Sequence, residues 1–213
     1  KETYFYPAST VKFPVALFAL EKVANLAGPR LNRETTMSMP PYDGEPSSVA
    51  EDVRRIFLVS DNAAFNRLFA FVGEEKCQQR LRALGLTDTQ IVHALGLKHM
   101  TFANPVRFLD SKGELLHSES LSLMSSPAGR SGKTLRKGVG YLDSGVLVNE
   151  PMDFSHKNVF PLHEQHLLVR EVYFPGEEGL RLTPADREFV KTTMGQFPRE
   201  CAATTDAAIR EEP

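Results

Sequence analysis

Ser9 and Lys12 stand three residues apart, immediately before an apolar run over residues 13–20. Side chains three apart share one face of a helix, so the hydroxyl and the amine can approach each other. An amine at the mouth of a buried helix is poorly solvated, and this favours its neutral form. A neutral amine beside a serine hydroxyl is a general base beside a nucleophile. Ser9 is the only serine in the chain that a lysine follows at the third position.

The same pair also has an ordinary structural interpretation. Ser9 can be the N-cap of the helix, and Lys12 can be a surface residue whose amine reaches solvent. A second motif, Ser-Asp-Asn at residues 60–62, changes the balance. It separates two expected helices, so its side chains can point back into a cleft. Asp61 and Asn62 alone would be ordinary capping and turn residues.

The elements that must position these residues are mostly helical. Hydrophobic spacing and turn residues predict helices over residues 9–28, 47–59, 63–72, 74–84, 162–172 and 184–194. Residues 106–109 and 114–117 flank a turn at 110–113 and predict a β-hairpin. Residues 86–104 and the basic stretch 125–140 are expected to be loops.

The composition suits one soluble globular domain, or two small ones, with 41% hydrophobic residues and a net charge of -2. Without a repeat or a linker, we expect a single domain over residues 1–213. The charge indicates no nucleic-acid partner, and the longest apolar run is too short to span a bilayer. Cys77 and Cys201 show neither metal-ligand spacing nor a disulfide framework.

With both motifs in place, the chain resembles the penicillin-recognising serine enzymes, most closely the class A β-lactamase-like family. Their signature is Ser-x-x-Lys, Ser-Asp-Asn and a Lys-Thr/Ser-Gly strand. The flanking residues agree, with Tyr-Pro-Ala-Ser-Thr-Val-Lys-Phe-Pro at 6–14 and Ser-Asp-Asn-Ala-Ala-x-Asn-x-Leu at 60–68. Residues 149–154 and 197–200 look like a divergent bacterial branch of serine hydrolases.

The resemblance implies an α+β fold, of which this chain would be the mostly helical portion of the β-lactamase/transpeptidase-like fold with a small hairpin. The family has sheet strands on both sides of the helical region in sequence. The chain starts just before Ser9 and stops before the last strands would come. We therefore expect a fragment truncated at both ends, without the flanking strands and without β-lactam turnover on its own.

The resemblance also implies a role for each matching residue. Ser9 would be the acylated nucleophile, and Lys12 the base that activates it or shares that task with a water. Ser60 would relay a proton to the leaving nitrogen, and Asn62 would hold the substrate amide and Lys12. The amide N–H of Ser9, at the helix start, would supply half of the oxyanion hole.

Two family features are missing. The loop over residues 89–99 has no acidic residue where the family carries a deacylating glutamate. His93 is a possible deacylation base there, or it is a loop histidine with satisfied hydrogen bonds. The Lys-Thr/Ser-Gly strand is also absent, since residues 131–134 read Ser-Gly-Lys-Thr in the wrong order. The same stretch fails as a phosphate loop, because Pro127 replaces the first glycine.

Other polar groups predict less. The His-Glu-Gln-His run at 163–166 lacks the spacing of a zinc site and is expected to be a solvated helix face. The Asp and Glu residues are dispersed in the sequence and show no pairing of the kind that a glycosidase uses for catalysis. The basic cluster is expected to be a loop that could contact an anionic substrate group; it comprises Arg130, Lys133, Arg136 and Lys137.

The expected function is therefore acylation of Ser9 by a β-lactam or a D-alanyl peptide-like small molecule, followed by hydrolysis. Two alternatives stay open: a D,D-peptidase or esterase, and a β-lactam-binding sensor that is acylated and stays so. Neither a metal nor an organic cofactor is implied. The family acts on cell-wall-related substrates, so a periplasmic or an exported, lipid-anchored location is expected.

Overall fold

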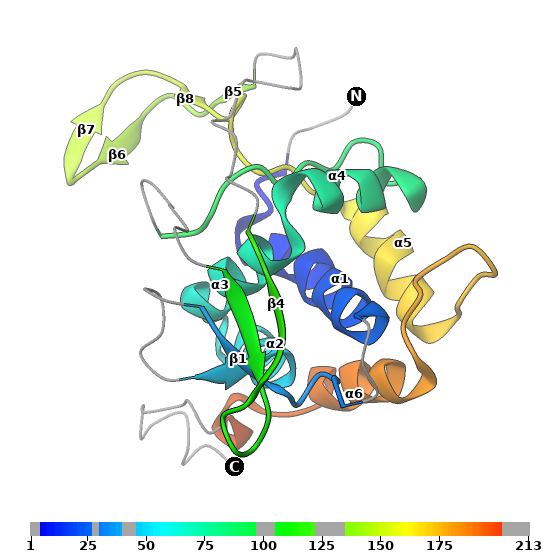
Figure 1. Ribbon diagram of the computed structural model, residues 1–213. Helices are drawn as coiled ribbons and strands as arrows, with labels where there is room; N and C mark the ends of the chain where they lie inside the picture. Colours follow the sequence, from blue (N-terminus) through cyan, green and yellow to red (C-terminus); the bar gives the residue numbers. More distant parts are fainter. Residues whose placement is uncertain (1–4, 27–29, 40–45, 97–104, 122–134, 202–213) are drawn as a thin grey trace.

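The computed structural model describes residues 5–26, 30–39, 46–96, 105–121 and 135–201 (Figure 1). The α-helices in this part of the chain are α1 (Lys12–Asn25), α2 (Val49–Val59), α3 (Asn62–Val72), α4 (Glu74–Ala83), α5 (Leu162–Tyr173) and α6 (Pro184–Met194). Two short 3-10 helices are η1 (Ala8–Val11) and η2 (Pro198–Glu200). The predicted helices are confirmed within a few residues at their ends, except that the expected end of the first helix, at 28–29, lies outside the described residues.

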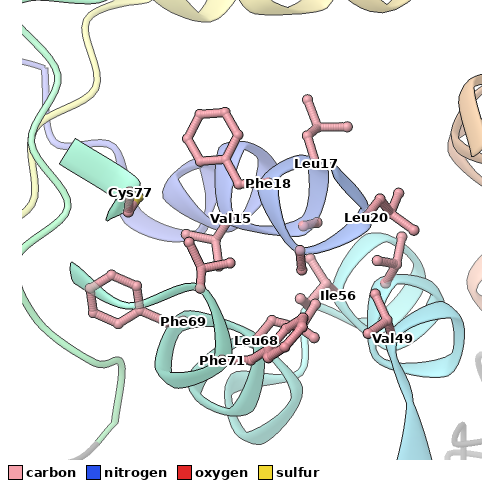
Figure 2. Packing of buried hydrophobic residues seen from close by; sticks show 14 of the residues in the cluster. Val15, Leu17, Phe18, Leu20, Val49, Ile56, Leu68, Phe69, Phe71 and Cys77 are labelled. Carbon is pink, nitrogen blue, oxygen red and sulfur yellow. The ribbon is translucent and has the colours of Figure 1, made fainter. Parts of the chain in front are cut away.

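Helix α1 is the centre of the hydrophobic core. It packs against α2, α3 and α4, and Figure 1 shows it in the middle of the helices. Figure 2 shows Val15 on the side that faces α3, with Leu17 and Phe18 pointing to the other side. These three side chains are buried. A helix that is apolar on every side is buried on every side, as the run over residues 13–20 predicts.

Four of the strands form a small antiparallel sheet in the order β2-β1-β3-β4. Its strands are β1 (Thr36–Ser38), β2 (Ser47–Ser48), β3 (Val106–Leu109) and β4 (Leu115–Glu119). The β3–β4 pair is the predicted hairpin, whereas β1 and β2 were not predicted. Met37 and Phe108 are cross-strand partners and both are buried, so this sheet joins the core. The protein thus has the expected α+β fold.

Two further strand pairs follow β4 in the sequence and precede α5. Strand β5 (Arg136–Lys137) pairs with β8 (Met152–Asp153), and β6 (Tyr141–Asp143) with β7 (Val146–Val148). Residues 125–140 were expected to form a loop, and this prediction is wrong at β5. A strand of two residues is too short to show an alternating pattern in the sequence. Its two basic side chains are exposed, and the rest of the expected cluster, Arg130 and Lys133, lies outside the described residues.

One expected solvated face is partly buried. Glu164, on α5, is buried and accepts hydrogen bonds from the amide of Asp88 and the hydroxyl of Thr89. The carboxylate therefore joins α5 to the loop after α4, a long-range contact that helical spacing cannot reveal. No helix in the described ranges is long and apolar enough to cross a membrane.

A buried ion pair holds α2 and α3 together. Asp52 is fully buried on α2 and accepts hydrogen bonds from the guanidinium of Arg67 on α3, with Nε at 3.0 Å from Oδ2. Ser47 donates a further hydrogen bond to this carboxylate at 2.8 Å. Both helices meet at residues 60–62, so this ion pair constrains the junction that carries the Ser-Asp-Asn motif.

We expect Asp52→Ala to lower the free energy of unfolding by about 3 kcal/mol, because it leaves the Arg67 charge buried without its carboxylate. Urea denaturation measures the change. The matched control is Glu51→Ala, on the same helix but in a half-exposed pair with Arg55, which should cost about 1 kcal/mol or less. Equal losses in the two variants would show that the buried pair contributes no more than the surface pair.

Candidate active site

Ser9 lies on a tight turn that leads directly into α1. It is exposed within η1, whose turn is closed by hydrogen bonds from the amide and hydroxyl of Thr10 to the carbonyl of Pro7, at 2.9 and 2.7 Å. Ala8 adopts a left-handed backbone conformation with φ 44°. Such strain in a residue other than glycine is typical of functional sites. The turn therefore presents the Ser9 hydroxyl to solvent at the head of the most buried helix.

Neither ordinary interpretation of the Ser-x-x-Lys pair fits the structure. The N-cap positions of η1 and α1 are Pro7 and Val11, so Ser9 caps neither helix. Lys12 is 1% exposed and does not extend to solvent. The Ser9 hydroxyl is therefore in solvent and the Lys12 amine is buried, one helical turn further along the chain.

Among the described residues, the hydrogen bonds of the Lys12 amine go to one residue of the second motif. Its Nζ donates hydrogen bonds to the Oγ of Ser60, at 3.0 Å, and to the Ser60 carbonyl oxygen. Both oxygens face the amine because Ser60 ends α2 in a left-handed conformation, with φ 54° and ψ 39°. Asp61 then caps α3 by accepting from the amides of Ala63 and Ala64, which confirms the predicted break and cap. The structure thus brings Lys12 and Ser60 together from positions 48 residues apart.

The environment of Lys12 favours its neutral form. Burial lowers the pKa of Lys12, and the nearby carboxylate of Asp61 offsets part of that effect. A neutral amine has two hydrogens and one lone pair. The two hydrogens suffice for the bonds to Ser60, which leaves the lone pair able to accept a proton. This is the arrangement that a general base requires.

Asn62 is the first residue of α3 and is exposed. The loop after α4 passes close to its side chain at Gly96. A Cβ atom added at Gly96 would lie 3.2 Å from Asn62 Nδ2, and Gly96 has a φ of +72° that favours glycine. The loop is held there by Asn66, whose amide side chain donates to the carbonyl of Leu95 and accepts from its N–H, both at 2.9 Å. Leu95 and Gly96 therefore form the part of the loop beside Asn62.

Asn66 was not predicted as a site residue. Its signal in the sequence is an amide within a mostly apolar helix, one turn after Asn62 and directly before Arg67. A buried amide must find hydrogen-bond partners, and here both partners are the main chain of one loop residue. Asn66 thus positions the loop that faces the motif.

Both ring nitrogens of His93 have hydrogen-bond partners. Nε2 accepts from the amide of Asn158 at 3.3 Å, so the proton is on Nδ1, which donates to the carbonyl of Ala94 at 2.7 Å. Burial lowers the pKa of His93. With both nitrogens engaged, His93 has the geometry of a loop histidine with satisfied hydrogen bonds rather than that of a base, the other role considered for it.

A potential metal-ligand group lies on α5 and on the loop after α4. Asp88, His163 and Glu164 place ligand atoms within 4.8 Å of one another. Glu164 already accepts from the amide of Asp88 and the hydroxyl of Thr89, so the group accounts for a contact between α5 and that loop. Within the part of the chain that the structure describes, nothing more points to a metal there. The Ser-Gly-Lys-Thr stretch at 131–134 lies outside the described residues.

Comparison with protein-family models matches residues 1–124 to the one described as the beta-lactamase enzyme family. The match covers more than half of the 213 residues and contains both motifs. No curated protein and no solved structure gives a significant match.

The environment of Lys12 predicts a measurable titration. We expect its pKa to lie below that of a free lysine, because burial disfavours the ammonium. Asp61→Asn should lower it further, since the variant removes the carboxylate that raises this pKa and keeps a residue type able to cap α3. The Cε resonance of Lys12, assigned with Lys12→Arg, reports both values in an NMR titration.

Asp143→Asn, which changes a carboxylate on the β6–β7 hairpin, is the control and should leave the midpoint unchanged. An unperturbed Lys12 midpoint, or an upward shift in Asp61→Asn, would contradict this account of the site.

Proposed function

The chain belongs to the beta-lactamase enzyme family, and from this we propose that it is a serine hydrolase of the class A type, acylated at Ser9. The substrate would be a β-lactam or a D-alanyl peptide-like molecule. The observation that carries the proposal is the hydrogen bond between the buried amine of Lys12 and the hydroxyl of Ser60, with the exposed Ser9 one helical turn before Lys12. The three residues supply a nucleophile, a base and a proton relay.

In the acylation step, Lys12 and Ser60 would together move one proton from the Ser9 hydroxyl to the leaving nitrogen. Neutral Lys12 takes the hydroxyl proton of Ser9 as its Oγ attacks the carbonyl carbon of the substrate. The amide N–H of Ser9 donates to the oxygen that becomes negative. The C–N bond then breaks, and the leaving nitrogen takes the hydroxyl proton of Ser60. Lys12, bonded to the Oγ of Ser60, returns a proton to it and becomes neutral again.

Asn62 would hold the substrate amide. Its exposed position at the start of α3, two residues after Ser60, supports that role, and the close approach of Gly96 restricts the space around its amide. Since cell-wall-related substrates are found outside the cytoplasm, the proposal includes export to the periplasm or a lipid-anchored location.

Deacylation would be slow in this protein. It needs a water whose proton goes to a placed base, and the loop over residues 89–99 has no Asp or Glu. The described loop residues beside Asn62 are Leu95 and Gly96, whose side chains carry no base. The same observation favours the second candidate function, a β-lactam sensor that remains acylated. A D,D-peptidase or esterase that handles β-lactams poorly is the remaining alternative. The lifetime of the acyl-enzyme separates them.

The roles of Ser9 and Lys12 can be tested by covalent labelling of the full-length protein with a fluorescent penicillin. We expect Ser9→Ala to abolish labelling, because it removes the nucleophile. Lys12→Ala should slow it by about a hundredfold or more, the usual scale of general base catalysis. Ser118→Ala is the control, because it removes an exposed hydroxyl on β4, outside both motifs. Undiminished labelling of Ser9→Ala would refute the assignment.

For the full-length protein with nitrocefin, we expect a burst of one equivalent followed by a much slower steady rate. The reason is that the loop over residues 89–99 has no Asp or Glu to activate the deacylating water. His93→Gln should change the slow rate by no more than a few fold, because the ring nitrogens of His93 are already bonded within the loop. Stopped-flow absorbance measures both phases. Fast steady turnover without a burst would show that some other group activates the water.

A further inference from the structure

Two aromatic rings from distant parts of the chain meet beside the nucleophile turn. The ring centroids of Tyr6 and Phe154 are 5.4 Å apart, with an interplanar angle of 52°. Tyr6 precedes Ser9 by three residues, so their Cα atoms are separated by about 10 Å at most. Although it packs against Phe154, the Tyr6 side chain remains 50% exposed. A half-exposed aromatic surface is therefore carried by the segment that leads into the Ser9 turn.

The backbone around Phe154 is held by several hydrogen bonds. Its N–H donates to the carbonyl of Leu135 at 2.7 Å, and its carbonyl accepts from Lys157 at 3.0 Å. The amide of Leu135 in turn donates to the hydroxyl of Ser155 at 2.9 Å. An aromatic ring carried by a fixed turn loses little conformational entropy when a ligand packs on it.

The same turn continues to the loop on the Asn62 side of the site. Gln90 and Val159 form an antiparallel bridge with reciprocal hydrogen bonds of 2.9 and 2.8 Å. The buried side chain of Asn158 accepts from the amide of Val92 at 2.8 Å and donates to the carbonyl of His93 at 3.2 Å. Residues 153–159 therefore join the aromatic pair to the loop that ends beside Asn62. The rings belong to the frame of the site rather than to a separate surface.

We propose that Tyr6 and Phe154 form an aromatic subsite that binds an apolar side group of the substrate and so determines its specificity. Half-exposed aromatic rings bind aromatic or aliphatic groups by stacking and by removing apolar surface from water. The tyrosine hydroxyl adds a polar contact at the rim. The subsite rests on the proposed function for the identity of the nucleophile beside it, and it assigns Tyr6 and Phe154 as specificity-determining residues.

The test compares two ligands that differ only in that side group. Benzylpenicillin carries a phenylacetyl group, and 6-acetamidopenicillanic acid has the same bicyclic ring and amide with a methyl in place of the benzyl group. Equilibrium binding of each is measured by calorimetry on full-length Ser9→Ala protein, which cannot be acylated at that position. We expect benzylpenicillin to bind more tightly, by about twofold to tenfold.

Tyr6→Ala and Phe154→Ala, each added to Ser9→Ala, should reduce this affinity ratio toward one, whereas Tyr6→Phe should preserve it. Phe174→Ala is the matched control, an exposed aromatic residue at the end of α5. A structural role alone would not move the ratio, because both ligands meet the same folded fraction of a given variant. An unchanged ratio in both alanine variants, equal binding of the two ligands, or no binding of either ligand to Ser9→Ala would overturn the subsite.

Acylation of the wild-type protein by the same two ligands separates the two proposals. If the affinity ratio behaves as expected and neither ligand acylates the wild-type protein, the subsite stands and the proposed function fails. If both ligands acylate it and the affinity ratio is unchanged in the Tyr6→Ala and Phe154→Ala variants, the function stands and the subsite fails.

Discussion

A buried lysine amine must place its hydrogens on acceptors, and among the described residues both acceptors belong to Ser60. The side-chain oxygen and the carbonyl oxygen of this residue face the same nitrogen at a point where the chain turns sharply. Helix α2 therefore ends at Ser60 in a left-handed conformation, and α3 starts two residues later under the cap of Asp61. The polar centre of the site and the break between two helices are one feature.

The rest of the fold keeps Lys12 away from water. Because α1 is packed by α2, α3 and α4, the first turn of α1 is buried although Ser9, one turn earlier, is exposed. Asp52 and Arg67 join the two helices that meet at the motif. The loop beside Asn62 is anchored in the core by apolar side chains, Leu86 and Ile91 among them. Amide side chains fix its main chain, Asn66 on one side and Asn158 on the other. Apolar and polar contacts together thus hold the loop beside the Ser-Asp-Asn motif.

Local sequence was sufficient for the helices, since their apolar spacing and capping residues act within a few positions. It also paired Ser9 with Lys12 and located residues 60–62. It missed the strand at Thr36–Ser38, because three residues are too few to show an alternating pattern. Contacts across long separations leave no local trace: Glu164 with Thr89, Asn158 with His93 and Tyr6 with Phe154. These contacts decide which loop residues lie beside the two motifs, so the sequence located the motifs but not the loop residues around them.

The most direct test of the central claim is to locate the covalent adduct. Full-length protein is incubated with benzylpenicillin, quenched in acid, and measured first as an intact mass and then after tryptic digestion. Cleavage after Lys1 and Lys12 leaves Ser9 on the peptide of residues 2–12. We predict one added penicilloyl group per chain, on that peptide and on Ser9 rather than Thr3 or Thr10. An adduct on any other residue, or no adduct at all, would contradict the assignment of Ser9 as the nucleophile.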